Sequence, residues 1–333
     1  MSAVNRQVLL SESPSGKLSV DHFRLAEAPM PVPGDGQVLV RVRYLSLDAA
    51  NRAWMQGATY RSAVESGTVM AGHAIAQVVE SRAPGFAPGD LVLGDTGWQE
   101  YAVLDAAGLQ KQPALEPVTH LLSVYGIAGL TAYFGLLEIG RPKAGDSVVV
   151  SAAAGSVGSL VGQIAKIQGA RVVGIAGGAR KCAMLTGELG FDAAVDYKAG
   201  ALFKDLKAAA PGGIDVYFDN VGGDIFEACL FQMKLHGRIA CCGAVSQYDG
   251  TPPAHGPRGV PGLIVTKRLT LQGFILYDFL PRAGEALAEL QKWVAEGRLK
   301  VREDIVEGLE NAPAGLVGLL AGENVGKRMV RVS

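Results

Sequence analysis

The sequence predicts an α/β protein in which a doubly wound parallel sheet is combined with a smaller β-rich domain. The chain has 333 residues, enough for about two domains of roughly 100–200 residues. Up to about residue 109, short β-branched runs alternate with turns, whereas from residue 146 onward such runs alternate with helical stretches. Hydrophobic residues make up 49% of the chain, so a large core can form despite 44 glycines.

The N-terminal part is expected to be a compact all-β unit. Its β-rich runs are 37–43, 74–81 and 91–94, and they are separated by turn sequences such as Pro84-Gly-Phe-Ala-Pro-Gly-Asp. The last thirty residues end in a further β run at 328–332, which we expect to rejoin the first unit. The predicted domains are therefore 1–125, completed by 301–333, and an inserted domain at 126–300.

The inserted domain contains six β-branched runs that alternate with helical stretches. This alternation favours one parallel sheet covered by helices, and residues 281–300, with apolar side chains at helical spacing, are expected to form one of the covering helices. The six runs are 147–152, 171–176, 193–197, 214–220, 238–242 and 269–276.

Charge and cysteine content exclude several function classes. Lys and Arg number 31 against 32 Asp and Glu, for a net charge of −1, so no overall basic field favours nucleic acid or an anionic membrane. The four cysteines form no Cys-x-x-Cys pair, so a disulfide framework is not indicated.

The location predicted from the sequence is cytoplasmic. Near the N-terminus no apolar run is long enough for a signal peptide. The uncharged stretch 147–165 is almost as long as a membrane span. Its β-branched start, glycine-rich middle and helical end instead predict a strand, a turn and a helix.

The strongest motif is the glycine-rich turn Gly155-Ser156-Val157-Gly158. It follows the first β run of the inserted domain, opens a helix and is followed by a second β run at βαβ spacing. Glycines let backbone N–H groups approach a pyrophosphate, and the helix N-terminus adds partial positive charge. The turn therefore predicts a dinucleotide site, although a tight strand-to-helix turn without a ligand remains the alternative.

The end of the second β run predicts the choice of cofactor. NAD enzymes place Asp or Glu there to bind the ribose hydroxyl, whereas this chain has Gly177-Gly178-Ala179-Arg180-Lys181. Two cations without a carboxylate suit a 2′-phosphate, which favours NADP(H) over NAD. A solvated basic start of a helix is the alternative.

A zinc site is not expected. Gly72-His73 is similar to the sequence around a zinc ligand of alcohol dehydrogenases, but Ala74 follows in place of Glu and no cysteine precedes residue 182. Catalytic zinc needs three protein ligands, and the segment supplies one. We therefore expect His73 to be structural or at the rim of the site, with no bound metal.

Several longer segments carry a resemblance to a known family. They read GLTAYFGLLE at 129–138, SAAAGSVGS at 151–159, VGQIAK at 161–166, YFDNVGG at 217–223 and GENVGK at 322–327. Together they resemble the zinc-independent medium-chain dehydrogenase/reductases, in particular the leukotriene B4 dehydrogenase, prostaglandin reductase and curcumin reductase group of NADP-dependent alkenal/one double-bond reductases.

The resemblance implies a Rossmann cofactor domain, a GroES-like catalytic domain, a homodimer, and NADPH-dependent reduction of the C=C bond of α,β-unsaturated ketones or aldehydes. It also implies where the cofactor lies. Gly155 to Gly158 would hold the pyrophosphate, Lys181 and Tyr197 the 2′-phosphate, and Gly178 replaces a frequent Ser of relatives. The remaining implied contacts are Asn220, Cys242, Gly243, Tyr248, Phe274, Ile275, Leu276 and Asn324.

Tyr248 is the candidate catalytic residue, because it ends a loop whose tyrosine lies beside the nicotinamide ribose and the substrate in the resembled family. Many relatives read Asp-Pro-Tyr-Met-Arg where this chain reads Asp48-Ala-Ala-Asn-Arg. Ala50 therefore stands in place of a substrate-lining tyrosine and cannot donate a hydrogen bond, so the pocket is expected to be wider or less polar there. Tyr60, Trp54 and His73 are the candidates that would compensate, with a packing role as the alternative for each, and Tyr60 is the candidate substrate contact.

Two alternative functions remain open on the sequence. The same fold without zinc also reduces quinones, and a catalytically idle NADP-binding protein would serve as a redox-sensing partner. The presence of Asn220, Tyr248 and Asn324 beside the phosphate-binding residues argues against the idle protein, because cofactor binding alone does not require the nicotinamide end of a site.

Overall fold

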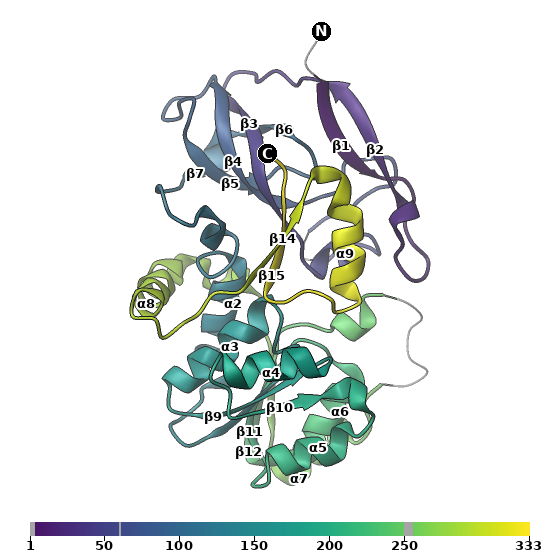
Figure 1. Cartoon of the computed structure of the whole chain (residues 1–333), viewed down its shortest axis with the longest axis vertical. Coiled ribbons are helices and arrows are strands. Elements are labelled where there is room, and N and C mark those ends of the chain that lie inside the picture. Colours follow the sequence, from purple (N-terminus) through teal and green to yellow (C-terminus); the bar gives the residue numbers. More distant parts are fainter. Residues whose placement is uncertain (1–3, 60, 250–255) are drawn as a thin grey trace.

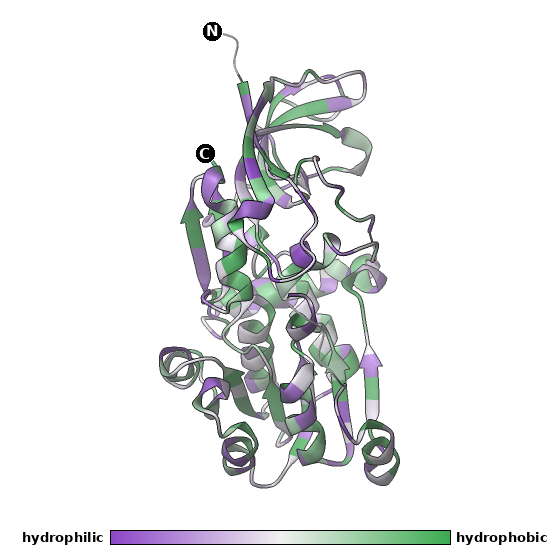
Figure 2. Cartoon of the chain, turned by 90° about the vertical axis from the view of Figure 1, so that its right-hand side faces the viewer, coloured by the Kyte–Doolittle hydropathy of each residue, from purple (hydrophilic) through white to green (hydrophobic). Residues whose placement is uncertain are grey.

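The computed structural model describes residues 4–59, 61–249 and 256–333. Within them the chain forms a six-stranded sheet, a seven-stranded sheet that includes β6 (Tyr101–Asp105), and the hairpin of β1 (Val4–Leu10) and β2 (Phe23–Pro29). Figure 1 shows the strands labelled β9 to β12 at one end of the long axis and β1 to β6 at the other. The view turned by 90° shows the same two parts stacked along that axis (Figure 2).

The six-stranded sheet is parallel throughout and has the order β10-β9-β8-β11-β12-β13. The chain therefore winds outward in both directions from the neighbours β8 and β11, which is the doubly wound arrangement predicted from the sequence. The strands are β8 (Ser147–Val150), β9 (Arg171–Ala176), β10 (Ala193–Asp196), β11 (Ile214–Asp219), β12 (Met233–Cys241) and β13 (Thr270–Gly273).

Helices cover both faces of this sheet. Successive valines of β8 point to opposite faces, Val148 and Val150 into one core and Val149 into the other, and all three are fully buried. One core takes side chains from α2 (Ile127–Phe134), α3 (Ser156–Ile167), α4 (Ala179–Gly187) and α8 (Ala283–Ala295). The other takes them from α5 (Leu202–Ala209), α6 (Gly223–Gln232) and α7 (Val260–Lys267).

Two predicted elements were too long. The strand expected at 269–276 ends at Gly273, and residues Leu276–Arg282 form a 3-10 helix. The helix expected at 281–300 is α8, which begins only after Pro281 and is followed by Gly297 at φ 69°. Proline lacks the backbone N–H that a continuing helix needs, and a left-handed glycine ends one.

The seven-stranded sheet has the order β14-β15-β3-β4-β5-β7 with β6 paired to β3. Its final strand β15 pairs antiparallel with β3, with Val330 opposite Leu45, so the C-terminal β run does rejoin the N-terminal sheet. α1 (Ala50–Trp54) and α9 (Ala312–Leu320) pack against it. The strands are β3 (Gln37–Ser46), β4 (His73–Ser81), β5 (Leu91–Asp95), β7 (Gln110–Lys111), β14 (Glu303–Glu307) and β15 (Lys327–Arg331).

The uncharged stretch 147–165 is divided as predicted, into β8, a turn and most of α3. Across the described ranges, no helix combines the length and the apolar character that crossing a bilayer demands.

Candidate functional site

The glycine-rich turn lies between β8 and the N-terminus of α3, at the carboxyl end of the sheet. Gly155 is the N-cap residue of α3, and Gly158 packs so closely on the turn after β8 that a Cβ there would overlap the Ala152 carbonyl oxygen. Glycine is therefore required for close helix–strand contact, and the free N–H groups of this twelve-residue helix point out of the sheet edge.

The side chain of Ser156 shows that the turn fits an anionic ligand. Its Oγ is buried and has no hydrogen-bond partner among the described residues. A buried hydroxyl without a partner is unfavourable, and this one lies at the positive end of a helix dipole, beside half-buried Val157. A phosphate oxygen would satisfy both features, so the turn fits the pyrophosphate of a dinucleotide.

The residues predicted to bind the 2′-phosphate meet at the end of β9. Gly178 has φ 92°, which L side chains rarely adopt, and the ring of Tyr197 lies against Gly177. Lys181 Nζ donates to the carbonyl oxygen of Gly322 at 2.7 Å, which leaves further N–H donors on the ammonium group. Burial first, and then the charges of Lys198 and other nearby cations, lower the pKa of Lys181. This concentration of cations fits a phosphate dianion.

A carboxylate that the sequence analysis did not single out supports this turn. Asp196, the last residue of β10, accepts hydrogen bonds from the backbone N–H of Gly178 at 2.8 Å and of Lys198 at 2.9 Å. It therefore fixes the strand-to-helix turn through the backbone. Its position directly before Tyr197 is the only sequence signal that could have indicated it.

Asn220 lies where β8 and β11 diverge. Its backbone N–H donates to Ser151 Oγ at 2.9 Å, and its side-chain Nδ2 donates to the Ser151 carbonyl oxygen at 2.7 Å. Both residues directly follow their strands, at the switch point where doubly wound sheets bind ligands. Asn220 is 8% exposed, so its orientation is fixed before any ligand binds.

Asp219 organises this region and was also missed from the sequence. Its buried Oδ1 accepts from Tyr217 Oη at 2.6 Å, from Ser151 Oγ at 3.2 Å and from two backbone N–H groups at 3.0 Å, those of Val221 and Gly222. Burial raises the pKa of Tyr217 well above its ordinary value. That tyrosine remains a neutral donor, and the carboxylate holds the loop after β11 in one conformation.

The loop after β12 packs on the same strand end. Both Cys242 and Gly243 donate their backbone N–H groups to the Asp219 carbonyl oxygen, at 2.8 and 3.1 Å. Tyr248 Oη accepts from the Ala244 N–H at 3.3 Å. Cys242, Gly243 and Tyr248 line a cavity of about 380 Å³ with residues of the loop after β11. Burial raises the pKa of Cys242 to about 12.

Asn324 lies in a C-terminal segment that contacts the glycine-rich turn. Its Nδ2 donates to the Gly326 carbonyl oxygen at 2.9 Å, and the Gly326 N–H donates to Ala154 at 2.8 Å. Gly326 also forms a parallel bridge with Gly155. The segment that carries Asn324 is therefore attached by its backbone to the glycine-rich turn.

The predicted stretch Phe274 to Leu276 follows β13 at the sheet edge. The Phe274 ring points into the core, 6.2 Å from the ring of Phe218 between centroids, and would overlap a Cβ at Gly135. Ile275 and Leu276 pass from the strand into the following 3-10 helix.

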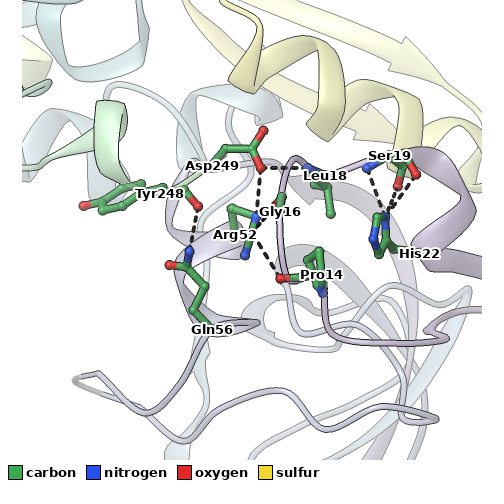
Figure 3. Close-up of polar contacts among 9 residues, drawn as sticks. All are labelled: Pro14, Gly16, Leu18, Ser19, His22, Arg52, Gln56, Tyr248 and Asp249. Carbon is green, nitrogen blue, oxygen red and sulfur yellow. Dashed lines mark hydrogen bonds and ion pairs between the residues drawn. The ribbon is translucent and has the colours of Figure 1, made fainter. Parts of the chain in front are cut away.

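Of the two candidate substrate residues, the structure describes only Ala50. Ala50 is the first residue of α1, half-buried against the core of the β-rich half. Arg52 of the same helix and nearby Gln56 contact Asp249 and Tyr248, as Figure 3 shows. Tyr60 lies outside the described residues. Arg52, Gln56 and Asp249 were not singled out from the sequence, because contacts between distant segments leave no local pattern.

His73 begins β4 and has an acidic partner. Its Nδ1 lies 3.1 Å from Asp95 Oδ1, and its side chain is 29% exposed. Over the part of the chain that the structure describes, no group of three His, Cys, Asp or Glu side chains could hold a metal ion.

Three features lie together at the carboxyl ends of the parallel strands: a glycine-rich turn with an unpartnered hydroxyl, a cationic cluster and a loop that carries a tyrosine. Together they define a nucleotide-dependent oxidoreductase built from two domains. The chain belongs to the medium-chain dehydrogenase/reductase family. The family described as "N-terminal domain of oxidoreductase" matches residues 6–112, and the one described as "Zinc-binding dehydrogenase" matches residues 156–295.

Relatives match the chain over almost its whole length. An NADPH-dependent curcumin reductase of Escherichia coli is 44% identical over 99% of this chain and 97% of its own length. A 2-alkenal reductase (NADP(+)-dependent) of Nicotiana tabacum is 39% identical over 99% of this chain and 98% of its own. The crystal structure of CurA from Vibrio vulnificus in complex with NADPH has a TM-score of 0.94 and 41% identity, and covers 98% of this chain and 99% of that one.

Proposed function

We propose that this chain is an NADPH-dependent oxidoreductase that reduces the C=C bond of α,β-unsaturated ketones and aldehydes. The observation that carries the proposal is the orphaned Ser156 Oγ in the glycine-rich turn, in a chain whose full-length relatives are named NADPH-dependent and 2-alkenal reductases. Gly155 to Gly158 would hold the pyrophosphate, and Lys181 with Tyr197 the 2′-phosphate. Asn220 and Asn324 would face the nicotinamide and its ribose.

NADPH held by these residues would supply the hydride that the electrophilic β-carbon of the substrate accepts. The electron pair of the C=C bond then moves toward the carbonyl oxygen, so the site must stabilise negative charge there and deliver a proton to the α-carbon. We assign the first task to the phenol of Tyr248, together with the cofactor's ribose hydroxyl. Its only described partner is the Ala244 N–H at 3.3 Å, which leaves the O–H free to donate to a substrate.

The test of this role is Tyr248→Phe. The variant keeps the ring but removes the donor, so kcat for an alkenone should fall about 100-fold, the usual cost of one oxyanion donor. NADPH affinity, measured by fluorescence titration, should stay within twofold. Full turnover with intact NADPH affinity would remove Tyr248 from the mechanism.

The function itself is tested by NADPH oxidation with 2-alkenones, 2-alkenals and quinones, run beside NADH and with product masses recorded. A gain of two hydrogens with the carbonyl retained identifies reduction of the double bond. Faster turnover of quinones would favour the quinone oxidoreductase instead. NADPH binding without oxidation by any substrate would favour the idle, redox-sensing protein.

Ala50 is proposed to widen the substrate pocket and make it less polar, because a methyl group offers no hydrogen bond. We propose Tyr60 as a second substrate contact. For this reason the specificity of the curcumin and prostaglandin reductases is not transferred to this chain.

The organisation of the molecule is proposed as follows. The catalytic domain is 1–125 with 301–333, and the cofactor domain is 126–300. A homodimer would form along β13, which is an edge strand of the parallel sheet. The cytoplasm is the proposed location, and four free cysteines suit such a reducing compartment. Gel filtration with light scattering tests the dimer.

A further inference from the structure

A buried arginine connects the two halves of the molecule next to Tyr248. The Arg52 side chain is 1% exposed, and its Nε donates to Asp249 Oδ1 at 3.1 Å. Its Nη2 donates to the carbonyl oxygens of Gly16 at 2.8 Å and Pro14 at 3.3 Å. Figure 3 shows this guanidinium between the 14–18 segment and the turn that carries Tyr248.

Two further contacts hold the same turn. Asp249 Oδ1 also accepts the backbone N–H of Leu18 at 2.7 Å, and Gln56 Nε2 donates to the Tyr248 carbonyl oxygen at 3.1 Å. Residues 248 and 249 are thus attached to three points of the β-rich half: the N-terminal segment, α1 and Gln56. The loop itself belongs to the parallel sheet, because it directly follows β12.

Within its own loop, Tyr248 makes two hydrogen bonds, both longer than 3 Å. Its backbone N–H donates to Val245 at 3.2 Å, and its hydroxyl accepts one long bond from Ala244. Because the ring extends from the backbone at residue 248, a shift of that backbone moves the hydroxyl with it. The contacts that the β-rich half makes to residues 248 and 249 therefore contribute to where the phenol lies.

The burial of Arg52 would be costly without this arrangement. A guanidinium taken out of water needs a hydrogen-bonded anion, and Asp249 is its only acidic partner among the described residues. Arg52 Nη1 is buried and has no hydrogen-bond partner among the residues that the structure describes. An apolar side chain would pack there at lower cost, so the ion pair is better explained by the geometry it imposes than by stability.

We propose that Arg52 and Asp249 are positioning residues that hold Tyr248 against the substrate, with Gln56 as an auxiliary contact. The proposal rests on the proposed function, because it assigns Tyr248 to the reaction. In this proposal the β-rich half acts on Tyr248 through the ion pair of Arg52 and Asp249. Neither side chain of the pair contacts the substrate or the cofactor.

The test combines Asp249→Ala and Arg52→Lys with Tyr248→Phe. Misplacing a catalytic group by about 1 Å can cost up to 100-fold in rate, so we expect each of the first two variants to lower kcat for an alkenone about tenfold. NADPH affinity and KM should change less than twofold. In the Tyr248→Phe background the same two substitutions should change kcat less than twofold, because the group they position is gone.

Conservative variants keep the test meaningful if Asp249→Ala is unstable. Asp249→Asn retains an acceptor for Arg52 and Leu18 and should restore most of kcat. Gln56→Leu removes a donor from an exposed side chain and should lower kcat about threefold by the same misplacement. Glu296→Ala, which breaks an exposed ion pair with Arg298, is the matched control and should leave kcat unchanged.

Hydrogen exchange separates this proposal from the proposed function. In the cofactor-free protein, Asp249→Ala should speed amide exchange in 244–249 at least tenfold while the helix α8 is unaffected. If the wild-type protein reduces no alkenone but exchange responds in this way, the function fails and the attachment stands. Two results would overturn the proposal. One is unchanged amide exchange in Asp249→Ala, and the other is an equal loss of kcat whether the substitutions are made in the wild-type protein or in Tyr248→Phe.

Discussion

The ammonium group of Lys327 lies 2.8 Å from Asp48 Oδ1 and 2.7 Å from the Leu47 carbonyl oxygen, and its side chain is 3% exposed. Lys327 directly follows Gly326, whose N–H donates to the carbonyl oxygen of Ala154, directly before the glycine-rich turn. Asp48 in turn accepts from Ser46 Oγ and lies two residues before α1. The pair of Lys327 and Asp48 therefore connects the glycine-rich turn to the segment before α1, the helix that carries Arg52.

Replacing this lysine should destabilise the fold. Lys327→Met leaves the Leu47 carbonyl and the Asp48 carboxylate without their donor, which should cost about 2–4 kcal/mol of unfolding free energy in urea denaturation. Asp48→Asn should cost less, because the Asp48 side chain is 37% exposed and Asn still accepts. Equal stability of wild type and Lys327→Met would show that the pair contributes nothing.

The same pair should make stability depend on acid pH. Burial alone raises the pKa of Asp48, but the charge of Lys327 and hydrogen bonds from Lys327 and Ser46 outweigh it, so the pKa falls below its ordinary value of 3.8. A carboxylate whose pKa is lower in the folded than in the unfolded protein stabilises the fold at pH values above the unfolded-state pKa. This stabilisation is lost as the pH falls through the folded-state pKa. The stability gap between wild type and Lys327→Met should therefore narrow below about pH 4.

Lys181 should decide between the two nicotinamide cofactors. Lys181→Gln would remove the proposed charge-assisted hydrogen bond to the 2′-phosphate, so the Kd for NADPH should rise roughly 10- to 100-fold while that for NADH stays the same. Fluorescence titration measures both. The exposed lysine of α5, changed as Lys204→Gln, is the control. Equal losses for NADPH and NADH would place the 2′-phosphate elsewhere.

NADPH affinity should also fall in alkaline solution. The pKa of Lys181 is lowered from 10.5 by burial and by neighbouring cations, and only the protonated amine attracts the phosphate. Affinity is therefore retained at neutral pH and lost as pH rises through this lowered value, earlier than for an ordinary lysine. Lys181→Arg, which keeps its charge, should remove the decline; a decline that persists in this variant would have another origin.

Gly326 is expected to tolerate no side chain. It has φ 73°, and a Cβ would overlap the Arg302 carbonyl, so Gly326→Ala must displace the segment bonded to the glycine-rich turn. The free energy of unfolding should drop by about 2 kcal/mol or more, and NADPH should bind more weakly. Gly212→Ala, with nothing within 4 Å of its Cβ, is the control. Normal NADPH binding by Gly326→Ala would separate this contact from the cofactor.

The thiols at the end of β12 should be unreactive in the native protein. Burial raises the pKa of Cys241 to about 11 and of Cys242 to about 12. At pH 8, Cys242 then has roughly a thousandfold less thiolate than a cysteine of ordinary pKa 9, and iodoacetamide reacts with the thiolate. Peptide mapping should find both unlabelled in native protein and labelled in urea. Rapid native labelling would contradict this burial.

The sequence was most informative where a pattern is local. The glycine-rich turn, the β-branched runs of the parallel sheet and the absence of a carboxylate after β9 are all visible within ten residues, and the alternation of strands and helices predicts a parallel sheet. Ends were less predictable: the strand beginning near Leu269 stops at Gly273, because side chains beyond it pack into the core instead of extending the ladder.

Residues that act across the fold were not predictable in this way. Asp219 looked like one more residue in a family segment, yet its carboxylate accepts four hydrogen bonds from three elements. Arg52 and Asp249 are 197 positions apart, and nothing near either residue indicates the other. Only the return of the chain through both sheets brings them together.

The position of β15 has a consequence for synthesis of the protein on the ribosome. Residues 44–46 of β3 pair with residues 329–331, so this part of the N-terminal sheet stays open until residues 329–331 emerge. The whole parallel sheet, ending at Gly273, is translated before then. The nascent chain must therefore protect an unpaired strand edge for most of its translation, and a prematurely terminated chain keeps that edge exposed to other chains.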